Sequence, residues 1–127
     1  MIAWAGQAVR INHYLDDSDT HAGWLVAAPL RHVTRWFELT DVELVELAWV
    51  LRACDRAVTE LFGSRRTMVA SLGWQVDDHL HVHCVPTFHD EITNGYENFN
   101  GSWAGVQLGA LEVCRLVGAR LCELAAQ

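Results

Sequence analysis

The stretch that decides the fold is His79-Leu80-His81-Val82-His83-Cys84-Val85-Pro86. Three histidines alternate in it with apolar residues, and successive side chains of a β-strand point to opposite faces of the sheet. The sequence therefore predicts a strand over residues 79–85, with the imidazoles on one face and the apolar side chains toward a core. Proline cannot donate to a ladder hydrogen bond, so Pro86 is expected to end this strand.

A row of imidazoles has three interpretations. The simplest is a solvated strand face. The second is a metal site, but alternate strand residues lie roughly 6.6 Å apart, so two of the histidines could share one ion and all three could not. Such a site would need a further ligand from His32, His89, Asp77 or a cysteine. The third is covalent catalysis, because imidazole is a nucleophile near neutral pH. His81 would then attack a substrate that its two neighbours flank.

Three segments, in order, resemble the histidine-triad (HIT) family. Residues 79–85 are similar to its signature, His-x-His-x-His followed by two apolar residues. Residues 23–33 (Gly-Trp-Leu-Val-Ala-Ala-Pro-Leu-Arg-His-Val) resemble its strand, proline and basic-histidine segment. Residues 37–43 (Phe-Glu-Leu-Thr-Asp-Val-Glu) resemble the opening of its long helix. The likeness spans roughly residues 9–90.

The remaining pattern predicts an α+β fold with an antiparallel sheet and two main helices. The resemblance implies that this is a HIT-like antiparallel sheet of about five strands, in a single domain over residues 1–127. Strands are expected over residues 9–14, 24–28, 66–72 and 79–85. A helix should begin after Thr40, whose capping box includes Glu43, and end at Gly63. Its apolar stripe is predicted to be Leu44, Leu47, Leu51, Cys54, Val58 and Leu61. A second helix is expected over residues 103–125.

Composition narrows the functional classes. The chain has 127 residues, 51% of them hydrophobic, and a formal net charge of −7, which argues against a broad nucleic-acid surface. No apolar run is long enough to span a membrane, and no secretory signal is evident. None of the four cysteines forms a C-x-x-C pair, and three lie in apolar stripes. We therefore expect buried thiols and a cytoplasmic protein.

The resemblance implies a mechanism. The middle histidine, His81, would attack the α-phosphorus of a nucleotide to form a nucleotidyl-histidine intermediate, which water or another acceptor resolves. His83 matches the position that contacts phosphate oxygens, and His79 the position that helps to hold the site. Gln75 matches a phosphate-contacting glutamine. No cofactor and no metal are implied.

Departures from the family pattern add candidate substrate-binding residues. Trp24 stands where many members carry a histidine, and His21 lies three residues earlier. Asp77 precedes the triad, where the family is usually apolar, and it shares the strand parity of the histidines. Trp103 is a candidate for stacking on a base. The substrate-binding set is thus Gln75, Trp24, His21, Asp77 and Trp103.

We therefore expect a HIT-type nucleotide hydrolase or nucleotidyl transferase that acts on a dinucleoside polyphosphate, a phosphoramidate or a similar nucleotide. Two alternatives remain open: a diverged nucleotide- or metal-binding protein with little turnover, and a metal-dependent enzyme that uses the triad as ligands. A homodimer is expected from the family and from apolar residues that one chain would struggle to cover: Leu111, Cys114, Leu116 and Trp49.

Overall fold

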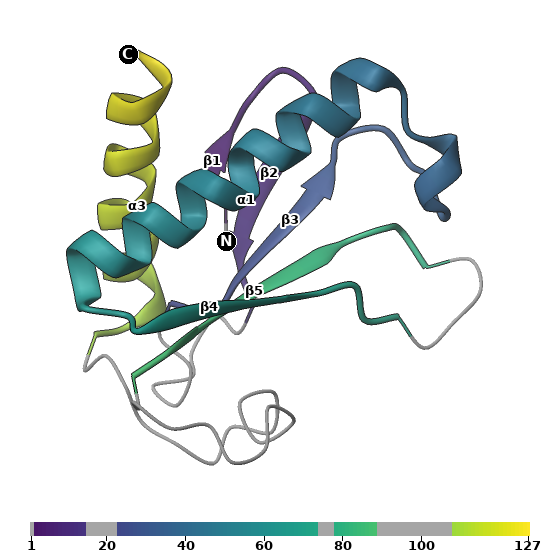
Figure 1. Cartoon of the computed structure of the whole chain (residues 1–127). Helices are drawn as coiled ribbons and strands as arrows, with labels where there is room; N and C mark the ends of the chain where they lie inside the picture. The colour runs from purple at the N-terminus through teal and green to yellow at the C-terminus, as the bar shows by residue number, and fades with distance from the viewer. Residues whose placement is uncertain (1, 15–22, 74–77, 89–107) are drawn as a thin grey trace.

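The computed structural model describes residues 2–14, 23–73, 78–88 and 108–127 (Figure 1). The elements in chain order are β1 (Ile2–Ala5), β2 (Val9–His13), β3 (Leu25–Pro29), the short 3-10 helix η2 (Trp36–Glu38), α1 (Asp41–Phe62), β4 (Arg66–Ala70), β5 (Val82–Thr87) and α3 (Ala110–Ala125). The strands form one antiparallel sheet in the order β1-β2-β3-β5-β4. Within the described residues, the predicted α+β fold with about five strands and two main helices is confirmed.

Both main helices pack on one face of the sheet (Figure 1). Alternate strand residues turn toward them and form the core: Val9, Ile11, Leu25, Ala27, Val82 and Cys84. Each of the fully buried valine, leucine and isoleucine side chains in this set contributes about 1.5–3 kcal/mol to folding. The strand residues in between face the opposite side of the sheet, which neither helix covers (Figure 1).

Helix α1 begins and ends as predicted. The Glu43 amide donates to the Thr40 hydroxyl at 3.2 Å, and the Thr40 amide donates to the Glu43 carboxylate at 2.9 Å. Gly63 takes the left-handed conformation, with φ of 73°, at the C-terminal end.

The predicted apolar stripe of α1 is only half right. Leu47, Cys54 and Val58 are buried, but Leu44 is 47% exposed and Leu61 is 36% exposed. Other residues of α1 are buried in their place: Val50, Ala53 and Ala57. The reason is α3, which packs beside α1 and is tied to it by an ion pair between Arg120 and Glu60 at 2.8 Å. A second helix on one flank rotates the buried stripe away from the one that the sheet alone would select.

Strand β5 differs from its prediction at both ends. It begins at Val82 rather than His79, because the Leu80 amide donates to the Val33 carbonyl at 2.7 Å. It also continues through Pro86, so the prediction that Pro86 ends the strand was wrong. Pro86 is paired with Thr67 of β4, whereas the pairing of β5 with β3 stops at Cys84. The missing amide hydrogen of Pro86 therefore interrupts no ladder.

Three other strands lie within two residues of their predicted ranges, namely β2, β3 and β4. Strand β1 was not predicted. It pairs with β2 at the edge of the sheet. The second helix begins at Ala110 among the described residues, and residues 103–107 of its predicted range lie outside them.

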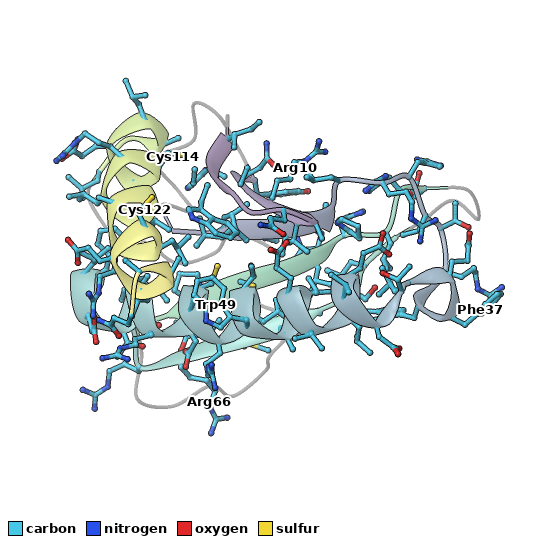
Figure 2. All side chains as sticks on the ribbon, turned by 90° about the horizontal axis from the view of Figure 1, so that it is seen from above. Arg10, Phe37, Trp49, Arg66, Cys114 and Cys122 are labelled. Atoms are coloured by element: carbon cyan, nitrogen blue, oxygen red, sulfur yellow. The ribbon has the colours of Figure 1, made fainter. Side chains whose placement is uncertain are left out.

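The structure describes all four cysteines, and none is in a disulfide. Cys54, Cys84 and Cys114 are buried, which confirms the prediction from the apolar stripes, and Cys122 is exposed. Figure 2 shows Cys114 and Cys122 along α3. One chain covers Cys114, so its inclusion among the uncovered apolar residues was wrong, whereas Leu111 is 72% exposed. No described helix combines the length and the apolar character needed to cross a bilayer.

Candidate active site

The three motif histidines occupy the approach to β5 and the strand itself. His83 lies within β5, and His79 and His81 directly precede it. Leu80, Val82 and Cys84 are at most 7% exposed, whereas His79 and His81 are half-buried. The alternation read from the sequence thus holds even where the backbone is not yet a strand. The buried set anchors the segment, and the imidazoles lie on the other side.

His81 is held in one tautomer by the backbone carbonyl of His79. Its Nδ1 lies 2.8 Å from the carbonyl oxygen of His79. A carbonyl oxygen can only accept, so Nδ1 carries the proton of the neutral ring. Nε2 then has a lone pair, and it has no hydrogen-bond partner within the described part of the chain. An imidazole in this state is equipped to attack an electrophile.

His83 is held in the opposite tautomer by Trp24. The indole Nε1–H of Trp24 donates to Nδ1 of His83 at 2.9 Å, in a buried contact. Indole nitrogen is only a donor, so neutral His83 carries its proton on Nε2. Tyr14 completes the group, because its ring stacks on Trp24 with centroids 4.5 Å apart and meets His83 edge-on at 5.1 Å.

Burial lowers the pKa of His83 from its ordinary value of 6.5 to about 4, with a smaller contribution from the neighbouring His81. His83 is 4% exposed. It is therefore a neutral hydrogen-bond donor at pH 7, and it adds no positive charge to the site.

His79 joins two parts of the chain. Its Nε2 lies 2.7 Å from the carbonyl oxygen of Pro29, so Nε2 carries a proton. Its Nδ1 lies 3.1 Å from Nδ1 of His32, and in a neutral His79 ring this nitrogen accepts a hydrogen bond that His32 Nδ1–H donates. The segment that carries His32 is itself fixed, because Arg31 donates to both carboxylate oxygens of Glu43 at 2.8 and 2.9 Å. The basic-histidine pair noted in the sequence thus supports the first triad histidine.

Beside these imidazoles a cavity of about 380 Å³ is lined by Arg10, Asn12, His13, Tyr14, Val26, Ala28, His79 and His81. The sheet register explains the arrangement. Arg10 pairs with Ala28 and Asn12 with Val26, and Val26 pairs with His83. The floor is therefore apolar and small, with polar side chains of β2 on one side and His79 and His81 on the other.

Sequence reasoning missed the β2 side of this cavity. The signal was present, because Val9-Arg10-Ile11-Asn12 alternates apolar and polar residues as the triad does. His13 belongs to the other parity. It pairs with the core residue Leu25, is 3% exposed, and accepts a hydrogen bond from the Gly23 amide at 3.1 Å.

Trp24 is the one predicted substrate-binding residue that the structure describes. It is 4% exposed and lies behind His83, so its contact is with a triad histidine. The predicted residues Gln75, His21, Asp77 and Trp103 lie outside the described residues, as does His89. Among the described residues, no three or more His, Cys, Asp or Glu side chains are grouped to hold a metal ion.

A groove of about 900 Å³ lies elsewhere, between the β1–β2 turn, α1 and the end of α3. It is larger than the cavity at the triad but contains no histidine or cysteine. Imidazole side chains line the smaller cavity and not the larger groove, so chemistry rather than size selects the candidate site.

No family model matches the chain, and no curated protein matches it. Solved structures do. A hypothetical histidine triad nucleotide-binding protein from Sulfolobus tokodaii is similar with a TM-score of 0.68 and 18% identity, over 97% of this chain and 84% of that one. The chain has the histidine-triad fold. A Zn-bound histidine triad family protein from Mycobacterium smegmatis gives 0.67 and 19%, over 98% and 86%. The diadenosine triphosphate hydrolase of Plasmodium falciparum gives 0.67 and 14%, over 96% and 76%.

The three histidines of the motif from which this fold takes its name are His79, His81 and His83. Around these imidazoles lie Trp24, which donates to His83, Tyr14, which stacks on Trp24, and Arg10, which lines the same cavity as His79 and His81.

Proposed function

We propose that the protein is a HIT-type nucleotide hydrolase or nucleotidyl transferase that cleaves at the α-phosphate through a covalent intermediate on His81. The observation that carries the proposal is the hydrogen bond from His81 Nδ1 to the His79 carbonyl, which leaves the Nε2 lone pair for attack. The diadenosine triphosphate hydrolase among the similar structures makes a dinucleoside polyphosphate the first substrate to test.

The reaction has two steps. In the first, Nε2 of His81 forms a bond to the α-phosphorus, and the bond from phosphorus to the leaving group breaks with its electron pair going to the leaving group. The ring becomes cationic, and its Nδ1–H bond to the His79 carbonyl strengthens. In the second, water or another acceptor attacks the phosphorus and loses a proton. The nitrogen–phosphorus bond breaks, and its electron pair returns to Nε2.

The neighbouring histidines have different roles in this proposal. His83, neutral and protonated on Nε2, donates a hydrogen bond to a phosphate oxygen, where charge accumulates in the transition state. His79 contacts Pro29 and His32 and so fixes the position of its own backbone carbonyl, which accepts the hydrogen bond from His81 Nδ1. Trp24 is a positioning residue for His83. The amide of Asn12 is a further candidate for substrate contact, together with the predicted Gln75, His21, Asp77 and Trp103.

We also propose a cytoplasmic homodimer. Apolar side chains remain exposed on α1 and on the edge strand β4. Val45 of α1 is 69% exposed, and Val69 of β4 is 52% exposed. An uncovered edge strand with apolar neighbours is a surface that proteins commonly cover by association.

The test uses His81→Asn, with Arg66→Gln as a control far from the cavity. The parent is incubated with diadenosine triphosphate or a nucleoside phosphoramidate, quenched rapidly, and examined by mass spectrometry. We expect one nucleoside monophosphoryl group per chain on the parent and on Arg66→Gln, and none on His81→Asn. Turnover should persist in excess chelator. Turnover that chelator abolishes would favour the metal-dependent alternative, and turnover by His81→Asn within tenfold of the parent would rule out the covalent route.

A further inference from the structure

Arg10 is the one permanent cation at the triad cavity. Every basic residue of the chain other than histidine is an arginine, the structure describes all nine, and only Arg10 lines this cavity. The nearest alternative by sequence, Arg31, is bound to Glu43 at 2.8 Å. Figure 2 places Arg66 on the far side of α1 from Arg10.

The Arg10 side chain is half-buried and has no partner among the described residues. Its Nε atom is buried and makes no hydrogen bond, and the structure gives the guanidinium no ion pair with a described residue. A buried polar atom without a partner costs about 1–3 kcal/mol, and more when it is charged. Natural structures tolerate this cost at sites where a ligand supplies the missing partner.

The sheet register sets Arg10 opposite the nucleophile. Arg10 pairs with Ala28 of β3, and Val26, the next residue on that face, pairs with His83 of β5. Continuing the register by one residue sets His81 level with Ala28. Arg10 and His81 therefore lie two strand spacings apart, roughly 10 Å between Cα atoms. Ala28, whose side chain is a methyl group, lies between them in the register, and Arg10 and His81 line the same cavity, so both side chains can reach one phosphate group.

We infer that Arg10 binds phosphate oxygens of the substrate, either on the phosphoryl group that His81 attacks or on the phosphate next to it. This inference rests on the proposed function and specifies its substrate as a phosphate-rich nucleotide. The guanidinium fork matches two phosphate oxygens at once, and its charge is permanent. In a chain of net charge −7, Arg10 offsets the charge of a phosphate chain that the neutral His83 cannot offset.

The test compares Arg10→Gln and Arg10→Lys with Arg66→Gln. Arg66 is an exposed arginine of β4, and its replacement by glutamine removes the same charge as Arg10→Gln does. Values of kcat/KM are measured for a nucleoside phosphoramidate with an uncharged leaving group and for a dinucleoside triphosphate. We expect Arg10→Gln to lose about 10–100-fold, the effect of a hydrogen bond to a charged group. Arg10→Lys should recover part of the loss, and Arg66→Gln should stay within twofold of the parent.

The two substrates locate the contact. A loss with both substrates means that Arg10 binds the attacked phosphoryl group, and a loss with the dinucleoside triphosphate alone means that it binds the adjacent phosphate. If Arg10→Gln matches Arg66→Gln on both substrates while His81→Asn is inactive, the inference about Arg10 is wrong and the proposed function stands.

A binding measurement tests whether Arg10 binds phosphate even if the protein lacks the proposed activity. Calorimetric titration with pyrophosphate, a nucleoside monophosphate and the unphosphorylated nucleoside requires no turnover. We expect Arg10→Gln to weaken the two phosphate ligands about 10–100-fold and to leave the nucleoside unchanged. This result in a parent protein without turnover would refute the proposed function and retain the Arg10 site. A parent that binds neither phosphate ligand would overturn both. Thermal melting of each variant checks folding, and Arg10→Lys supplies a variant that keeps the charge and the aliphatic stem.

Discussion

Replacing Trp24 with phenylalanine should loosen His83 without emptying the site. The phenyl ring retains an aromatic partner for Tyr14, which stacks on Trp24 at 4.5 Å, but the indole N–H that donates to His83 Nδ1 at 2.9 Å is lost. The buried Nδ1 then has no donor. Leaving such an atom unsatisfied costs about 1–3 kcal/mol of folding free energy. The same bond favours the neutral ring, so its loss should raise the pKa of His83.

The magnitude has an upper limit. A hydrogen bond between uncharged groups contributes about 0.5–1.5 kcal/mol, so the proton affinity of His83 should rise by no more than about tenfold. Burial is the larger cause of the low pKa, about 4, and it remains in the variant. The pKa should therefore stay below the ordinary 6.5. Because His83 keeps its Nε2–H but loses its orientation, we expect kcat/KM to fall about tenfold, less than the 100-fold or more of a deleted donor.

The assay is a histidine-detected nitrogen NMR titration from pH 4 to 8, together with steady-state rates. Trp36→Phe is the matched control, because its indole also donates to a side chain, Ser71 Oγ at 3.3 Å, but on the protein surface. In the parent, His83 should show one neutral tautomer with the proton on Nε2. A Trp24→Phe protein in which the tautomer, the pKa and the rate of turnover all equal those of Trp36→Phe would refute this account of His83.

Three further outcomes follow from the structure. The pKa of His83 is about 4 in the folded state and 6.5 in the unfolded state, so the unfolded chain binds the proton at a higher pH. The free energy of unfolding should therefore fall by about 2 kcal/mol between pH 7 and pH 5. Urea titrations should show this pH dependence in the parent and a weaker one in His83→Asn. Gly118→Ala should lower the free energy of unfolding by about 1–3 kcal/mol in denaturant titrations, because a β-carbon there would meet the Ala3 carbonyl oxygen of β1. Val69→Lys should convert the proposed dimer to a monomer by light scattering, since Val69 is exposed on the edge strand β4, and a parent that is monomeric at micromolar concentration would exclude the dimer.

The alternation over residues 79–85 predicted which side chains share a face, because that depends only on local geometry. Its failure at the strand ends has non-local causes. Leu80 bonds to Val33, and Pro86 lies where β5 has a partner on one side only. No pattern within the motif contains those partners. The capping box and the C-terminal glycine of α1 were predictable for the same reason that the alternation was, since caps are made by residues within a few positions.

The contacts that set the tautomer of each histidine could not be predicted from the sequence. Trp24 and His83 are 59 residues apart, and His79 meets His32 across 47. The register of the strands brings such pairs together, and neither segment alone predicts how it pairs with the other. Arg10 and Asn12 were within reach, because they alternate with buried residues of β2. What the sequence lacked there was the identity of the facing strand, which decides whether an exposed row on a sheet lines a site or faces solvent.

The division of charge at the site follows from what a nucleophilic imidazole requires. In the proposed mechanism His81 must be neutral to attack, and a cationic neighbour on the same strand would both lower its basicity and compete for the phosphate. Burial, with a smaller contribution from His81, lowers the pKa of His83 and keeps it neutral, and the Trp24 indole donates to its Nδ1. The positive charge that an anionic substrate needs is then supplied from β2, two strands away, by a group that never loses its proton. A sheet makes this separation available, because residues level with one another on alternate strands face one cavity without touching.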